Sequence, residues 1–161
     1  MRAEAIVDLS AIKFNVELLK KTSGTKLLAV VKADAYGHGL VPVAQAAVSA
    51  GADYLGVALL EEAVALREAG ITAPILAWLV QPGSDFSQAI SLDIDIAAAS
   101  LKALSEIAAA SRQLQKKARV HLEVDTGMTR GGFLAEWDQL NSEHVKEVEI
   151  VGIFSHFARA D

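Results

Sequence analysis

Short apolar runs alternate with segments of helical periodicity along most of the chain. The runs are typical of strands and lie at residues 27–31, 54–58, 74–80, 94–98, 119–125 and 149–154. Apolar positions three and four residues apart predict helices over 9–21, 41–50, 60–69, 84–91, 100–114 and 134–140. Residues 5–7 are predicted to form a further short strand. Asp8 or Ser10 is suited to cap the first of these helices, and Ser100 is suited to cap the helix at 100–114.

This regular alternation predicts a parallel sheet with helices packed outside it. Six strands, counted from Leu27, leave two architectures open. A complete doubly wound sheet of five or six strands fits 161 residues. A (β/α)8 barrel needs eight strands and typically about 250 residues. No G-x-G-x-x-G follows any strand, so the sequence does not support a dinucleotide site.

Composition narrows the class of protein. The 20 acidic and 15 basic residues give a net charge of −5, which argues against a nucleic-acid partner. The absence of cysteine excludes a disulfide framework and a thiolate metal site, and no His, Asp or Glu cluster has metal-ligand spacing. No apolar run approaches the roughly 18 residues of a membrane span, and the N-terminus lacks the apolar core of a signal peptide. We therefore expect a cytoplasmic enzyme, or a piece of one, that does not bind membranes.

The apolar run at 27–31 ends abruptly on Lys32. The run predicts a strand buried on both faces, and an ammonium group at its end would then lose its contact with water. Such a lysine suits Schiff-base chemistry with a carbonyl compound, although a solvated lysine before an ordinary loop would give the same pattern. The glycines of the next segment permit a turn, in which Tyr36 offers a polar tip and His38 is expected to form a hydrogen bond.

A second group of polar residues lies on and after the strand at 119–125. Strand alternation places His121, Glu123 and Asp125 on one face, which would line a polar cavity if the strand is central. The glycines that follow allow the loop to fold so that Arg130 turns back towards the end of the strand. A guanidinium group there suits a carboxylate, although a surface arginine after a half-exposed strand would look the same.

Three stretches of the chain resemble the alanine racemase family. A-V-V-K-A-D-A-Y-G-H-G at 29–39 is similar to that family's pyridoxal phosphate (PLP) lysine motif. D-T-G-M-T-R at 125–130 is similar to its D-T-G-M-x-R segment, and S-H-F-A-R-A-D at 155–161 to its T-H-F-A-x-A-D segment. The resemblance implies an α/β fold, the PLP-binding (β/α)8 TIM-type barrel. Residues 1–161 would be its N-terminal portion, truncated to about six strands.

The resemblance also implies cofactor-binding residues. Lys32 would form the Schiff base with pyridoxal 5'-phosphate and serve as one of two acid/base groups in catalysis. Tyr36 would contact the cofactor phosphate, and His156 would pack against the pyridine ring. Trp78 falls where family members often place an apolar residue beside the cofactor, although a buried aromatic side chain on a strand needs no ligand to explain it.

The segment expected to bind the substrate differs from the family pattern at one position. The resemblance implies that Arg130 lies close to the substrate carboxylate, and Met128 belongs to the same matched segment. Many family members carry a carbamylated lysine seven residues before this arginine, where this chain has Glu123. Because a glutamate is already anionic, we predict that Glu123 orients Arg130, directly or through water, without carbamylation.

By resemblance the reaction is the interconversion of L-alanine and D-alanine by a homodimer, which supplies D-alanine for cell-wall peptidoglycan. The family's second acid/base group, the last barrel strands and the C-terminal β domain would lie beyond these residues. We therefore expect the 161 residues alone to be inactive or nearly so, and their open sheet edges to associate. The alternatives are a non-enzymatic PLP-binding protein of the same barrel type, another PLP enzyme such as an amino-acid decarboxylase, and a structural fragment without cofactor.

Overall fold

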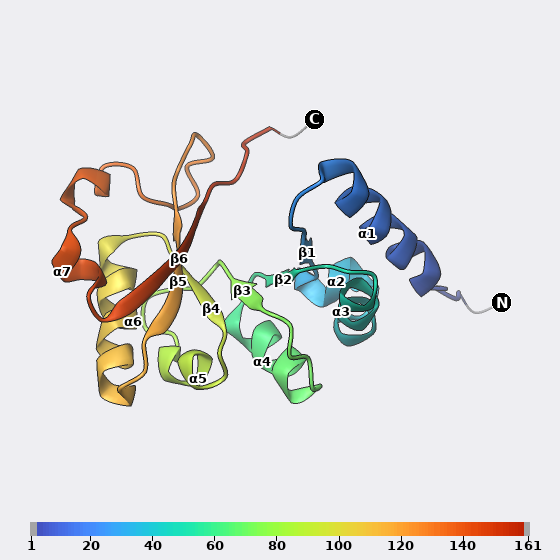
Figure 1. The fold of residues 1–161 in the computed structure, drawn as a ribbon, viewed down its shortest axis with the longest axis horizontal. Coiled ribbons are helices and arrows are strands. Elements are labelled where there is room, and N and C mark those ends of the chain that lie inside the picture. Colours follow the sequence, from blue (N-terminus) through green and yellow to red (C-terminus); the bar gives the residue numbers. More distant parts are fainter. Residues whose placement is uncertain (1–2, 160–161) are drawn as a thin grey trace. The chain divides into compact units, whose positions relative to one another are not determined.

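Figure 1 shows the computed structural model, which describes residues 3–159. Ala160 and Asp161, the last residues of the third matched stretch, lie outside the described residues. The helices are α1 (Leu9–Ser23), α2 (Lys32–Gly37), α3 (Leu40–Ser49), α4 (Leu60–Glu68), α5 (Phe86–Ser91), α6 (Leu101–Leu114), α7 (Ser142–Val145) and the 3-10 turn η1 (Trp137–Gln139). The strands are β1 (Leu28–Val30), β2 (Tyr54–Val57), β3 (Ile75–Ala77), β4 (Asp95–Ala98), β5 (Ala118–Glu123) and β6 (Val148–Phe154).

The order of the strands in the sheet follows their order in the sequence, from β1 to β6. The pairs β1–β2, β3–β4, β4–β5 and β5–β6 are parallel. A doubly wound sheet reverses its strand order part-way along, whereas the strands of a βα barrel follow one another around the sheet. The sequential order therefore confirms the barrel-type prediction and excludes the doubly wound alternative.

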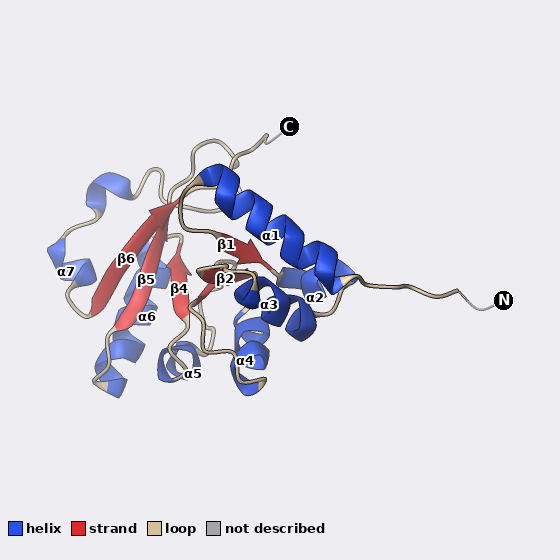
Figure 2. Ribbon diagram, turned by 45° about the vertical axis from the view of Figure 1, so that its right-hand side comes forward, coloured by secondary structure: helices blue, strands red, loops and turns tan. Residues whose placement is uncertain are grey.

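The chain divides into two compact units, with the boundary between Ile75 and Leu76. In the first unit, α1 lies alongside α3 (Figure 2). Its core includes Leu55 and Val57 of β2 together with Ala63 and Leu66 of α4, which are all fully buried. The burial of these side chains gives the unit a hydrophobic core of its own.

Hydrogen bonds at both ends fix the position of α1. The Asp8 carboxylate caps its N-terminus by accepting bonds from the first turn, as predicted. Near its other end, Lys20 donates to the Gly51 carbonyl and pairs with Asp53 at 3.1 Å. Asp53 also accepts the Leu27 amide at 2.8 Å, and this bond, followed by the one from Lys20, lowers the pKa of Asp53. The connection into β1 is thus tied to the connection into β2.

In the second unit, α5 and α6 pack against each other and against β4. Ser100 caps α6: its hydroxyl accepts the amide of Ala103 at 3.2 Å. The core combines Leu104 of α6 with Ile96 of β4 and Val120 of β5, which are all fully buried. The predicted helix cap and buried helix face at 100–114 are therefore confirmed.

Three predictions about single elements are wrong. Residues 5–7 form no strand, since no described strand pairs with them. Residues 134–140 contain only the short η1 turn, because Leu134 and Trp137 are 68% and 39% exposed and the segment buries no continuous apolar face. The strand β1 is not buried on both faces, because it stands at the end of the strand order and its Val30 side chain is 42% exposed.

Candidate functional site

Val31 separates Lys32 from the end of β1, and Lys32 opens a turn of left-handed helix. Residues 33–36 have φ between 51° and 56° and ψ between 38° and 52°. None of the four is a glycine, and left-handed helical backbone costs about 1–2 kcal/mol for each L-residue. The sequence predicted a turn at this point and attributed it to glycines, so the left-handed residues are a finding of the structure. Such a turn persists only where surrounding bonds hold it.

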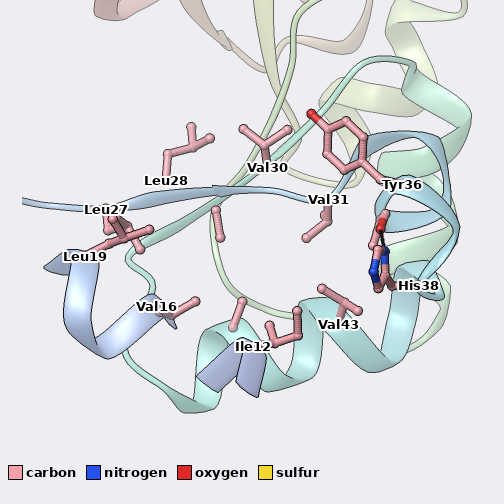
Figure 3. Close-up of a pocket in the computed structure, with 13 residues that line it drawn as sticks. Ile12, Val16, Leu19, Leu27, Leu28, Val30, Val31, Tyr36, His38 and Val43 are labelled. Atoms are coloured by element: carbon pink, nitrogen blue, oxygen red, sulfur yellow. Dashed lines mark hydrogen bonds between the residues drawn. The ribbon is translucent and has the colours of Figure 1, made fainter. Parts of the chain in front are cut away.

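Several hydrogen bonds within the segment hold the turn. The Ala35 amide donates to the Val31 carbonyl at 2.9 Å, and the Asp34 carboxylate accepts the Leu40 amide at 2.7 Å. The Nδ1 atom of His38 lies 2.8 Å from the Ala35 carbonyl oxygen, which it reaches as a donor (Figure 3). The expectation that His38 forms a hydrogen bond within the loop is confirmed.

The Lys32 side chain points towards Tyr36, with the ammonium nitrogen 5.6 Å from the ring centroid. This separation is within the range of a cation–π contact. Lys32 is half-buried and Tyr36 is 61% exposed, so the expected withdrawal of Lys32 from water is only partial. No carboxylate among the described residues forms an ion pair with Lys32. The amine is therefore not held by an ion pair in this part of the chain.

An apolar pocket of about 430 Å³ lies between α1, β1 and α3 (Figure 3). Ile12, Val16 and Val43 line its lower side in the view of the figure. Lys32 is not among the lining residues, and none of the lining side chains is an Asp, Glu, Lys or Arg. The hydrogen-bonding side chains of the lining are those of Tyr36 and His38, and its other side chains are apolar.

In the second unit, Glu123 and Arg130 form an ion pair at the carboxyl end of β5. The distance from Arg130 Nη2 to Glu123 Oε1 is 3.7 Å, and the side chains of Arg130 and Glu123 are 35% and 5% exposed. Burial raises the pKa of Glu123, while the charge of Arg130 and then that of His156 act in the opposite direction. The loop therefore does bring Arg130 back to the strand, with part of its guanidinium group still open to solvent.

The opposite end of β5 carries a second charged cluster, which the sequence interpretation did not include. Asp95 of β4 is 2% exposed and accepts bonds from Arg119 Nε at 2.8 Å and from His121 Nε2 at 3.1 Å. His121 thus pairs across to β4. Alternation marks Asp95 and Arg119 as charged positions in neighbouring apolar strands, but their pairing depends on the register between the two strands.

The loop that carries Arg130 is closed at its base by backbone bonds. The Phe133 amide donates to the Glu123 carbonyl at 2.7 Å, and the Asp125 amide donates to the Phe133 carbonyl at 3.1 Å. Asp125 lies beyond the end of β5, so the expectation that it belongs to the strand face is wrong. Its carboxylate instead accepts amides of the loop, first that of Thr129, and these bonds lower its pKa. Asp125 therefore shapes the loop.

The remaining predicted residues take different positions. His156 follows β6, is exposed and lies near enough to Glu123 to influence its charge. Met128 is half-buried in the loop that carries Arg130. Trp78 follows β3 directly instead of lying within it, and is half-buried. The second unit thus brings Glu123, Arg130 and His156 into one neighbourhood, while the structure does not link Trp78 to them.

Residues 3–159 contain no candidate metal site and no helix that could span a membrane. No group of three or more His, Cys, Asp or Glu side chains in this part of the chain has the arrangement of a metal site. None of its helices has the length and apolar character required to cross a membrane.

Ionisable side chains thus lie near the carboxyl ends of parallel strands in each unit, after β1 in the first and at the ends of β5 and β6 in the second, as in α/β barrel proteins. Residues 7–161 match the family described as "Alanine racemase, N-terminal domain". The chain belongs to this family, as its motifs predicted.

Relatives of known name agree with this assignment. The chain is 50% identical to the alanine racemase of Beutenbergia cavernae and 48% identical to that of Salinispora tropica, over 99% of its own residues in both cases. It covers 44% and 45% of those two proteins. The crystal structure of alanine racemase from Streptomyces lavendulae, 42% identical, superimposes with a TM-score of 0.91 over 96% of this chain and 42% of that one. The chain therefore spans less than half the length of these relatives.

Proposed function

We propose that these residues provide the cofactor lysine and the substrate-binding arginine of an alanine racemase that interconverts L-alanine and D-alanine with PLP. The observation that carries the proposal is the position of Lys32. It follows a strand end, as barrel sites do, and Lys32 is only half-buried and has no carboxylate partner among the described residues. Membership of the alanine racemase family supports the same assignment.

The residues after β1 fit PLP. The Lys32 amine, which has no carboxylate partner among the described residues, suits attachment to the cofactor aldehyde, and the side chain of the exposed Tyr36 can offer its hydroxyl to the phosphate. When bound, PLP supplies an electron sink that makes the α-proton of an amino acid removable. In this proposal Lys32 removes or returns that proton on one face of the substrate, and His156 packs against the cofactor ring.

The residues after β5 fit the carboxylate of alanine. Arg130 is held by Glu123 on one side and is partly open to solvent, so it can still bind a carboxylate. The buried Glu123 keeps the guanidinium group oriented without a carbamylated lysine, and Met128 lies in the same loop. This role for Glu123 rests on the 3.7 Å ion pair.

Several parts of the proposal concern a longer protein. The chain covers 43–45% of the curated relatives, and we propose that these residues without the remaining length have little or no racemase activity. A homodimeric enzyme in the cytoplasm that supplies D-alanine for peptidoglycan is proposed for the whole protein. Turnover is therefore to be measured on a polypeptide that also carries the remaining length.

The decisive test is covalent capture of PLP by the purified chain. After incubation with PLP and reduction with borohydride, peptide mass spectrometry should locate the cofactor on Lys32. Lys32→Ala should lose this adduct, whereas Lys26→Ala, which changes a lysine just before β1, should retain it. Equal capture by the wild type and by Lys32→Ala, or no adduct on Lys32 in the wild type, would refute the assigned role.

A further inference from the structure

The carboxylate of Glu62 joins two segments of the first unit. Its Oε1 atom accepts the amide of Ala33, the residue that follows Lys32. Its Oε2 atom accepts the amides of Ala58 and Leu59, at 2.9 and 3.0 Å, in the connection between β2 and α4. Glu62 is the third residue of α4, so one side chain at the start of a helix holds the backbone beyond two neighbouring strands.

The chemistry of this contact requires an acceptor at both carboxylate oxygens. A carboxylate accepts at either oxygen, and its bonds to amides are charge-assisted. A side-chain amide offers one accepting oxygen only, because its nitrogen donates. Glutamine at position 62 therefore cannot bind both segments, and its single accepting oxygen should stay with the amides of Ala58 and Leu59, which lie four and three residues from it in the sequence.

The bond to Ala33 falls where the left-handed turn begins. Residues 33–36 are unfavourable in this conformation, and Glu62 contributes a bond from 29 positions away in the sequence. The other bonds of the turn come from within residues 31–40. Glu62 therefore fixes the direction in which the chain leaves Lys32 relative to β2.

We propose that Glu62 is a positioning residue for Lys32, which sets the left-handed turn and with it the approach of the Lys32 amine to the Tyr36 ring. The importance of this position for cofactor capture rests on the function proposed above. The geometric part of the inference is independent of PLP, and the two parts can be tested separately.

The test compares Glu62→Gln with Glu61→Gln, which changes the exposed neighbour on the same helix. NMR would report the exchange rate of the Ala33 amide and the ring-current shift that Tyr36 imposes on the ε-protons of Lys32. Tyr36→Leu defines the shift in the absence of the ring. We expect Glu62→Gln to speed amide exchange about tenfold, which corresponds to the loss of one charge-assisted bond, and to abolish the ring-current shift. Glu61→Gln should change neither.

Cofactor capture provides the functional readout. The rate of PLP attachment to Lys32 should fall about tenfold in Glu62→Gln and stay unchanged in Glu61→Gln. Unchanged exchange and ring-current shift in Glu62→Gln would overturn the proposal, and so would faster exchange with an unaltered shift. Failure of the wild type to capture PLP would count against the proposed function, while the NMR results would still decide the role of Glu62. Should Glu62→Gln not fold, Glu62→Asp, which keeps the charge but is too short to bridge both segments, is measured in the same way.

Discussion

Replacing Gly132 with alanine should open the loop that carries Arg130. Gly132 has a φ of +112°, and a Cβ atom there would lie 2.6 Å from the Asp125 nitrogen and 2.9 Å from the Val124 carbonyl carbon. Both are backbone atoms at the base of the loop, so neither can turn aside as a flexible side chain would. The substitution should therefore disturb the backbone bonds between Phe133 and the end of β5.

The loss of stability expected for Gly132→Ala has two sources. A non-glycine residue in a sparsely populated backbone region costs about 1–3 kcal/mol. Forcing a methyl group into closely packed atoms costs about 1–3 kcal/mol more. Gly127, in the same loop, has a similar φ of +121°, but a methyl group added to it would meet no atom within 4 Å. Gly127→Ala should therefore show the backbone cost alone, whereas Gly132→Ala should show both.

Urea unfolding, followed by far-ultraviolet circular dichroism and tryptophan fluorescence, measures the free energy of unfolding of each variant. We expect Gly132→Ala to lose about 2–6 kcal/mol and Gly127→Ala about 1–3 kcal/mol. The fluorescence should also respond, because Trp137 packs edge-on against Phe133 with ring centroids 6.2 Å apart. Equal losses for the two variants would refute the steric argument.

Two further predictions concern the core and the response to pH. Leu104→Ala should lower the free energy of unfolding by about 2–5 kcal/mol because Leu104 is fully buried. Leu114→Ala, at a position 38% exposed, should cost much less. Similar losses for the two variants in a denaturant titration would contradict this. Burial raises the pKa of Glu123 in the folded chain above its ordinary value of 4.5. The contribution of Glu123 to the free energy of unfolding therefore declines as the pH rises from about 4.5 through the raised pKa. Glu123→Gln should remove this decline, and unfolding curves of both proteins with the same pH dependence would contradict the prediction.

Features that depend on residues close together in the sequence could be predicted from the sequence. The strand before Lys32, the helix cap at Ser100 and the return of Arg130 to its strand follow from a continuous apolar run, a capping residue and glycine placement, respectively. Each of these signals lies within a few residues of the feature that it predicts.

The features that were missed depend on contacts between distant residues. An alanine-rich segment such as 33–36 has no local preference for left-handed backbone, and its partner Glu62 is remote in the sequence. The pairing of Asp95 with Arg119 likewise depends on the register of β4 against β5, which alternation within either strand does not reveal. A hydrogen bond between residues distant in the sequence thus supports the backbone conformation at 33–36, and another accompanies the burial of Asp95.

The cluster of Asp95, Arg119 and His121 limits how this part of the family can diverge. Asp95 is 2% exposed, and leaving a buried charge without its partners is strongly destabilising, whereas exchanging the whole group for apolar residues of similar volume can be neutral. Substitutions at these three positions are therefore tolerated together far more readily than singly. Relatives should carry either the complete set or an apolar replacement of it, and the three positions should vary as one unit.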